Sequence, residues 1–342
     1  MNRVASMPVE ERRVVFSEAA ERLQIQPVIV EKDFWVCWAL RLLFGRAEWS
    51  EALVFKGGTA LSKVFGIIRR FSEDIDLGVS PATVEISEAE VEQARSRTQR
   101  DAWMRNLEAA CGTWVAQRLQ PELERDIRAA IGGKPSGEGW LRFQMDAASH
   151  SPVLLFDYPS ALAAGSDYIL RWVKLEFGSL TDQRPVGRHR VRPWLADILP
   201  VPLAEMGCDV VALEVERAFW EKATILHAEH HRDLAMPMPG HYSRHYADVA
   251  AMANRPETGR ALADDALRER VVVWKSRFFA RSWARYDLAV PGTFRLVPPA
   301  ARRTELARDY LEMRDMFLEP PASFDVILET LRRLEARINR IA

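Results

Sequence analysis

The sequence predicts an α+β protein in which a mixed sheet with flanking helices comes first and a helical region follows. Two observations predict this class. Short apolar runs that alternate with polar residues, bounded by Gly and Pro, recur through the first 200 residues, as they do in strands. Beyond about residue 211, apolar residues instead recur at the spacing of amphipathic helices. We therefore expect a sheet domain over residues 1–200 and a helical domain over residues 201–342.

The composition is that of an ordinary globular protein of about two domains. The 47 Lys and Arg residues balance 48 Asp and Glu residues, so any contact with nucleic acid depends on a local patch. Lys occupies only seven positions, and where Arg is the default a retained Lys can mark the need for a compact point charge. Three widely spaced cysteines, no signal peptide and no long apolar run predict a cytoplasmic protein without membrane association.

Before residue 80, apolar spacing and turn residues predict five elements. Gly45 ends the second helix, and Gly57-Gly58 forms a tight turn between a buried strand and the next helix. The predicted elements are helices over 9–24, 28–44 and 59–65 and strands over 51–56 and 72–79.

Beyond residue 80, a polar and charged helical insert is expected around 86–130. Alternating strands follow it, and then helices that are separated by breaks such as the Pro-rich segment 236–240. The predicted strands are 140–146, 153–158, 168–178 and 188–194, and the predicted helices are 212–231, 243–254, 264–283, 302–317 and 323–341.

The strongest chemical signal is the pair Asp74 and Asp76 within the predicted strand 72–79. Alternation puts both carboxylates on one face, about 7 Å apart at Cα, which is close enough for them to share a pair of metal ions. Carboxylate oxygens together with substrate phosphates are the ligands that Mg²⁺ prefers. Alone, the two acids would equally suit a solvated strand face.

A phosphate-binding turn is predicted upstream of this pair. Gly57 and Gly58 allow a phosphate to approach the backbone, and the free amides at the start of the next helix favour an anion. Thr59 and Ser62 add hydroxyl donors, and Lys56 is a further candidate at the end of the strand. A strand, a double-glycine turn and a helix start, followed by two acids on the next strand, together predict a site for phosphate and metal.

A third carboxylate would complete the metal site. Alternation in the predicted strand 168–178 places Lys174 and Glu176 on one face, which makes Glu176 the best candidate. Asp146 and Asp157, on neighbouring predicted strands, are the alternatives. Lys174 and Glu176 would otherwise form a solvent-facing ion pair that stabilises the protein little.

Two basic segments leave alternatives open. Residues 184–192 carry four arginines on and beside a predicted strand, which suits either the phosphates of RNA or the protection of an edge strand from aggregation. Residues 227–231 (HAEHH) suggest zinc, but their order is not H-E-x-x-H and no cysteine lies nearby, so a polar helix end is the favoured interpretation.

These motifs, in this order, resemble the DNA polymerase β-like nucleotidyltransferase superfamily. More closely, residues 55–77 (FKGGTALSKVFGIIRRFSEDIDL) resemble the AbiEii/AbiGii abortive-infection toxin family. Three further segments match that family, the last more loosely: Glu31-Lys32-Asp33-Phe34-Trp35, Glu221-Lys222 and Arg244-His245-Tyr246-Ala247-Asp248. Two departures are a slightly long gap between Gly58 and Asp74 and a long, histidine-rich segment between Lys222 and Asp248.

The resemblance implies a polymerase β-like nucleotidyltransferase fold and a set of roles. Asp74, Asp76 and Glu176 would ligate Mg²⁺, with two ions expected, and Lys222 would neutralise the NTP triphosphate. Asp248 is a secondary catalytic candidate. The implied activity is transfer of a nucleotide from an NTP to an RNA acceptor, in particular the tRNA 3′ end, which blocks translation. A toxin–antitoxin or phage-defence system, with a cognate antitoxin as partner, is the implied setting.

Two other functions fit the same residues. The site could carry out kinase-like phosphoryl transfer from an NTP to a protein or a small molecule. The chain could also be a non-catalytic module that binds a nucleotide or RNA. The intact pair Asp74 and Asp76 favours catalysis over such a module.

Overall fold

The computed structural model describes residues 1–87, 96–147, 149–162, 170–180, 182–199 and 206–340. By its internal contacts, the chain divides into two compact units. The first, which we call the sheet unit, comprises Met1–Val64 and Ser72–Leu213. The second, the helical unit, comprises Phe65–Phe71 and Glu214–Ala342. A short segment of the N-terminal half therefore belongs to the helical unit.

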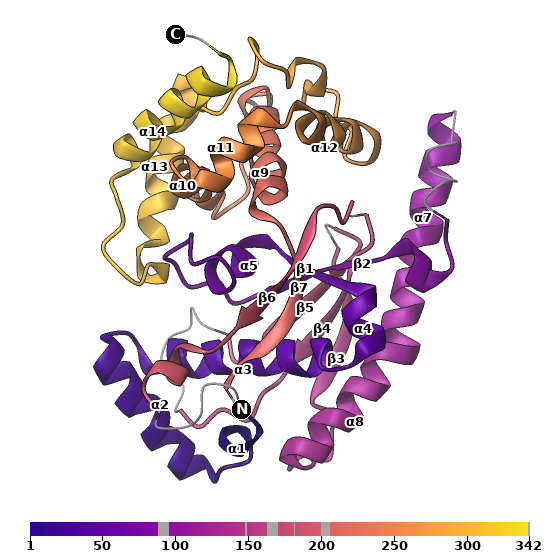
Figure 1. Cartoon of the computed structure of the whole chain (residues 1–342), viewed down its shortest axis with the longest axis vertical. Coiled ribbons are helices and arrows are strands. Elements are labelled where there is room, and N and C mark those ends of the chain that lie inside the picture. The colour runs from indigo at the N-terminus through magenta and orange to yellow at the C-terminus, as the bar shows by residue number, and fades with distance from the viewer. Residues whose placement is uncertain (88–95, 148, 163–169, 181, 200–205, 341–342) are drawn as a thin grey trace. The chain divides into compact units, whose positions relative to one another are not determined.

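The sheet unit is built around a seven-stranded mixed sheet with the strand order β3-β4-β5-β2-β1-β7-β6 (Figure 1). β2 and β5 run parallel, as do β1 and β7, and the other neighbouring strands are antiparallel. The strands are β1 (Leu53–Lys56), β2 (Ile75–Val79), β3 (Leu141–Met145), β4 (Pro152–Phe156), β5 (Val173–Gly178), β6 (Val186–Val191) and β7 (Cys208–Leu213). This mixed sheet, together with its helices, confirms the predicted α+β class.

Helix α3 (Pro27–Phe44) lies at the centre of the core of the sheet unit because its sequence is apolar on nearly every side. It packs against β5 and β7, and its Trp35 and Trp38 contact the ring of Phe156 on β4. The other helical segments of this unit are α1 (Asn2–Ala5), α2 (Val9–Leu23), α4 (Ala47–Ala52), α5 (Gly57–Lys63), η1 (Pro81–Val84), α7 (Arg97–Trp114), η2 (Val115–Leu119), α8 (Gln120–Ile131) and η3 (Trp194–Asp197).

The helical unit is organised around the largely buried helix α9 (Val215–His230). The indole Nε1 of Trp220 on α9 donates a hydrogen bond of 3.0 Å to the carbonyl of Ala261, which joins α9 to α11. The other helical segments are α10 (Ser243–Met252), α11 (Pro256–Ala263), α12 (Asp265–Phe278), η5 (Tyr286–Leu288), η6 (Ala300–Arg302), α13 (Arg303–Glu312), η7 (Arg314–Met316) and α14 (Phe324–Ile338). None of the helices in the described part of the chain combines the length and the apolar character that a membrane span requires.

The histidine-rich end of α9 has a packing role. His227 is fully buried, and its Nδ1 accepts a hydrogen bond of 3.1 Å from the backbone N–H of Arg295. Its Nε2 lies 2.9 Å from the carbonyl of Arg285 and must carry the proton, because a carbonyl only accepts. Both ring nitrogens therefore anchor loops of this unit.

Strand β7 is the main element that the sequence did not predict. Its apolar run continues into α9 without a turn signal, so periodicity does not separate strand from helix there. Because β7 lies between β1 and β6, the sheet unit extends to Leu213, beyond the expected end at residue 200. The predicted boundary at 200–201 itself lies outside the described residues, as do residues 88–95 of the predicted insert and residues 168–169 of a predicted strand.

Candidate active site

Asp76 and Glu176 lie side by side on neighbouring parallel strands. Asp76 of β2 pairs in register with Glu176 of β5, and on its other side it pairs with Lys56 of β1. Residues paired directly across a sheet project to the same face, so Lys56, Asp76 and Glu176 form one row. All three are partly exposed, whereas Ile75 and Leu77 beside Asp76 are buried. The alternation read from the sequence thus brings two of the predicted metal ligands together.

The glycine turn lies directly against this row. Gly57 has φ of +78°, a left-handed conformation that favours glycine. A Cβ at this position would lie 2.0 Å from Oδ2 of Asp76, a distance that no real side chain tolerates. Gly57 is therefore needed twice, for its backbone conformation and for the room it leaves to the carboxylate of Asp76. Gly58 and Ser62, which follow on α5, are partly exposed.

Thr59 has a different place from the one expected of a phosphate ligand. It is fully buried, and its hydroxyl donates to the backbone carbonyl of Asp74 and lies 2.8 Å from the hydroxyl of Ser72. A hydroxyl has one proton to donate, so it must accept from Ser72. Thr59 therefore positions Asp74 instead of presenting a free hydroxyl.

Glu176 and Asp146 belong to one polar cluster. The ammonium of Lys174 donates a hydrogen bond of 2.7 Å to Oε2 of Glu176 and lies 3.7 Å from Oδ2 of Asp146. The hydroxyl of Ser149 lies 3.1 Å from Oε1 of Glu176 and 3.1 Å from Oδ1 of Asp146. The two candidates for the third ligand are thus joined through Lys174 and Ser149.

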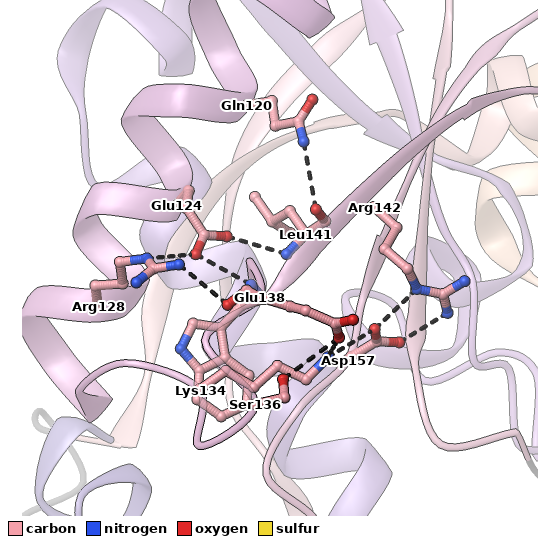
Figure 2. A network of polar contacts seen from close by, with 10 residues as sticks. Gln120, Glu124, Arg128, Lys134, Ser136, Glu138, Leu141, Arg142 and Asp157 are labelled. Atoms are coloured by element: carbon pink, nitrogen blue, oxygen red, sulfur yellow. Dashed lines mark hydrogen bonds and ion pairs between the residues drawn. The ribbon is translucent and has the colours of Figure 1, made fainter.

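Asp157, the other alternative for the third ligand, belongs to a separate network (Figure 2). Arg142 of β3 donates two hydrogen bonds of 2.8 Å to its two carboxylate oxygens, and Lys134 lies 3.2 Å from Oδ2. Burial by itself would raise the pKa of Asp157, but these two cations outweigh it and lower the pKa. Asp157 is therefore a structural counter-ion.

The side chains on this face provide the type of ligand atom that a hard divalent cation prefers. Asp74, Asp76 and Glu176 offer carboxylate oxygens, and the Gly57 turn leaves room beside Asp76 that a Cβ would fill. As placed, however, the described residues contain no group of three His, Cys, Asp or Glu side chains arranged to hold a metal ion. At Glu176, one oxygen accepts from Lys174 and the other contacts Ser149.

The Glu-Lys-Asp segment of α3 is buried and holds several neighbouring segments. Glu31 accepts hydrogen bonds from the Ser160 hydroxyl at 2.7 Å and from the Ala161 N–H at 2.6 Å. Lys32 pairs with Glu73, and Asp33 pairs with Lys63 on α5. The backbone N–H of Trp194 donates to the second oxygen of Asp33 at 2.8 Å. These three side chains are therefore structural. Lys32 contacts the residue before Asp74, and Asp33 contacts α5, the helix that begins at the glycine turn.

In the helical unit, Lys222 and Asp248 form a cluster with Arg70. Lys222 Nζ lies 2.8 Å from Oδ2 of Asp248, and Arg70 donates from Nε and Nη2 to the two carboxylate oxygens, at 3.0 Å each. Burial would raise the pKa of Asp248, but Arg70 and Lys222 outweigh it and hold the pKa below its ordinary value. Sequence reasoning named Lys222 and Asp248 but missed Arg70. The only signal for Arg70 was its place within the matched segment 55–77.

The arginines of residues 184–192 lie on and beside β6, an edge strand that pairs only with β7. Arg188 is exposed on this strand. Arg190 pairs with Asp209 at 3.1 Å, and Arg192 pairs with Asp197 at 3.0 Å. Arg190 and Arg192 are therefore partly neutralised by surface ion pairs.

Comparisons with known proteins relate the chain to one family of enzymes. A family model described as "Nucleotidyl transferase AbiEii toxin, Type IV TA system" matches residues 41–330. Among solved structures, the chain is similar to MenT4, a nucleotidyltransferase toxin from Mycobacterium tuberculosis H37Rv, at 14% identity and a TM-score of 0.49, over 96% of this chain and 90% of that chain. Among curated proteins, none matches the chain significantly. The matched range includes Lys56, Asp76, Glu176 and the cluster around Asp248.

Proposed function

Because the chain belongs to the AbiEii family of nucleotidyl transferase toxins, we propose that it transfers a nucleotide from an NTP to an RNA acceptor, the 3′ end of tRNA, and thereby blocks translation. Family membership by itself implies a nucleotidyltransferase toxin of a toxin–antitoxin system, with an NTP substrate and a cognate antitoxin. The RNA acceptor, the dependence on Mg²⁺ and a cytoplasmic location are our additions.

The register of Asp76 with Glu176, beside the Gly57 turn, is the observation that supports this activity most directly. We assign Asp74, Asp76 and Glu176 as the groups that hold Mg²⁺, with Asp146 as the alternative to Glu176. Bound Mg²⁺, expected as two ions, would neutralise the phosphates and make the acceptor hydroxyl a better nucleophile. Thr59 keeps Asp74 in place through the Asp74 carbonyl.

The remaining assignments concern the two substrates. We assign Lys56, Gly57, Gly58 and Ser62 to the triphosphate, because they lie on the row of Asp76 or on the turn beside it. That Lys222 neutralises the triphosphate stays a prediction, and Asp248 would then position the Lys222 ammonium. For the RNA we assign the exposed Arg188 on β6, which can contact backbone phosphates without regard to sequence.

Labelled nucleotides test the proposed reaction. Total RNA is incubated with the protein and each of the four NTPs, labelled at either the α- or the γ-phosphate, with Mg²⁺ or with EDTA. We expect α-label in RNA of tRNA size, only with Mg²⁺. Asp76→Asn and Glu176→Gln should reduce incorporation at least ~100-fold, the scale on which loss of one electrostatic group acts. The matched control is Asp209→Asn, which breaks only the exposed pair with Arg190.

Each other outcome has a distinct meaning. Transfer of the γ-label alone, to protein or small molecules, would establish a kinase-like reaction instead. Binding of NTP or RNA without any transfer would establish a non-catalytic module. Unchanged toxicity of the Asp76→Asn protein in cells would contradict a catalytic toxin altogether.

A further inference from the structure

Lys174 is a cation that contacts two carboxylates on the acidic face of the sheet unit. Its ammonium lies 2.7 Å from Oε2 of Glu176 and 3.7 Å from Oδ2 of Asp146, and its charge also interacts favourably with Asp74. Lys174 and Glu176 stand two residues apart on β5, so both side chains project to the face that carries Asp76. One positive charge therefore serves a carboxylate on β5 and carboxylates at the ends of β3 and β2.

The contacts of Lys174 differ from those of an ordinary surface ion pair. The Lys174 side chain is 25% exposed and that of Glu176 is 24% exposed, so the pair is largely shielded from water. Glu176 Oε2 accepts from Lys174 and Oε1 faces Ser149, so each carboxylate oxygen already has one partner. A hard cation that binds Glu176 must share this carboxylate with the ammonium of Lys174 or displace it.

We propose that Lys174 competes with the divalent ion for Glu176, so that the ammonium and the ion exchange on this face of the sheet. The inference rests on the proposed metal-dependent function. A permanent positive charge a few ångströms from a divalent ion repels it, and the carboxylate that the ammonium holds is withdrawn from the ion. Lys174 thereby weakens the binding of the free ion and makes the negative charge of a bound nucleotide more important for retaining it.

Binding of Mn²⁺ alone tests this proposal without reference to catalysis. Mn²⁺ favours the same oxygen ligands as Mg²⁺, and its free concentration is measured by electron paramagnetic resonance. We expect Lys174→Met and Lys174→Gln to bind Mn²⁺ about 10-fold more tightly than the parent, the scale of removing one nearby charge. Lys174→Arg keeps the charge and should stay within about 3-fold of the parent.

Lys134 provides a matched control in the same unit. Lys134 and Asp157 are 21% and 20% exposed, nearly the same as Lys174 and Glu176, and their nitrogen and oxygen lie 3.2 Å apart (Figure 2). Lys134→Met removes a comparable ion pair from a different network and should leave the affinity for Mn²⁺ unchanged. A general effect of net charge would instead tighten binding in both Met variants alike.

The possible results separate this inference from the proposed function. Unchanged or weaker binding of Mn²⁺ by folded Lys174→Met or Lys174→Gln would overturn the inference, even if the parent transfers nucleotides. If neither neutral variant folds, the ammonium is a structural requirement and not an exchangeable counter-ion, which also overturns it. Tighter binding by the variants of a parent that shows no transfer would support the inference and contradict the proposed function.

Discussion

Lys32 and Glu73 form an ion pair that ties the buried helix α3 to the residue immediately before Asp74. The ammonium of Lys32 also donates a hydrogen bond of 2.8 Å to the carbonyl of Leu170, three residues before β5. One side chain thus holds the segments that lead into β2 and β5, the two parallel strands that carry Asp76 and Glu176. Burial lowers the pKa of Lys32, and Glu73 opposes this by favouring its charged form.

Removing Glu73 should destabilise the sheet unit more than removing Lys32. The Lys32 side chain is 2% exposed, so Glu73→Ala removes the carboxylate that pairs directly with a buried ammonium, at a cost of about 3–5 kcal/mol. Glu73 is 23% exposed and can be hydrated when Lys32→Met removes its partner, so this variant should lose less. Urea unfolding measures both free energies. If Lys32→Met lost as much unfolding free energy as Glu73→Ala, or more, burial of the ammonium would not be what decides the cost.

Gly57→Ala should abolish nucleotide transfer. The added Cβ would lie 2.0 Å from Oδ2 of Asp76 and force that carboxylate to move, and displacement by about 1 Å can cost ~100-fold in rate. Gly132→Ala is the matched control, because Gly132 has φ of +80° but nothing lies within 4 Å of its Cβ position. Both variants place a Cβ at a residue of similar positive φ, and only Gly57→Ala adds a contact with Asp76, so transfer assays on the two proteins test that contact. If Gly57→Ala and Gly132→Ala were equally active, the space that Gly57 leaves for Asp76 would not matter for transfer.

Asp248→Asn should destabilise the helical unit by about 3–5 kcal/mol, because Arg70 and Lys222 lose their shared buried counter-charge. Asp287→Asn, which breaks the exposed pair with Arg285, should cost far less, because surface ion pairs stabilise proteins little. The pKa of Asp248 is lowered on folding, so its stabilisation is present above the unfolded value of about 3.9 and is lost as pH falls through the folded value. Thermal unfolding near neutral pH compares the two variants.

Mild acid should destabilise the helical unit through His227. Burial lowers the pKa of His227 from 6.5 to about 4, and protonation would also break the hydrogen bond that Nδ1 accepts from the backbone N–H of Arg295. The unfolded chain binds this proton first, so stability is full above pH of about 6.5 and falls by up to about 3 kcal/mol as pH drops towards 4. The difference between the unfolding free energies at pH 5 and pH 7 should be smaller in His227→Gln than in the parent. An unchanged difference in that variant would exclude His227 as the cause.

Arg188→Gln should weaken RNA binding to a similar extent for all sequences. Arg188 is exposed on the edge strand β6, and loss of one phosphate contact lowers the salt dependence of binding by about one unit of slope. Arg190→Gln should have a smaller effect, because Arg190 is paired with Asp209 and lies against Gly207. Fluorescence anisotropy with labelled RNA at several salt concentrations measures both slopes. If the dependence of affinity on salt were the same in the parent and both variants, β6 would not contact RNA.

Features that depend on local spacing could be predicted from the order of the residues. Alternation placed Asp76 on the exposed side of β2 and Glu176 on that of β5, and the double glycine marked the turn at which β1 leads into α5. The sparse lysines also carried information, since Lys32, Lys63, Lys174 and Lys222 each pair with a carboxylate. The first features follow from the two-residue repeat of a strand, and the last follows from the rarity of lysine. Both patterns can be read directly from the order of residues.

Contacts between residues far apart along the chain became known from the folded structure. Arg70 and Asp248 are 178 positions apart, and no local period relates them. Strand β7 became visible as a strand only by its pairing with β1 and β6, because its apolar run merges with that of α9. Lys174 of β5 interacts with Glu176 on its own strand, with Asp146 at the end of β3 and with Asp74 before β2, so it is more than one half of a local surface pair. Strand order and side-chain pairing are long-range properties, and the local pattern of a chain does not encode them directly.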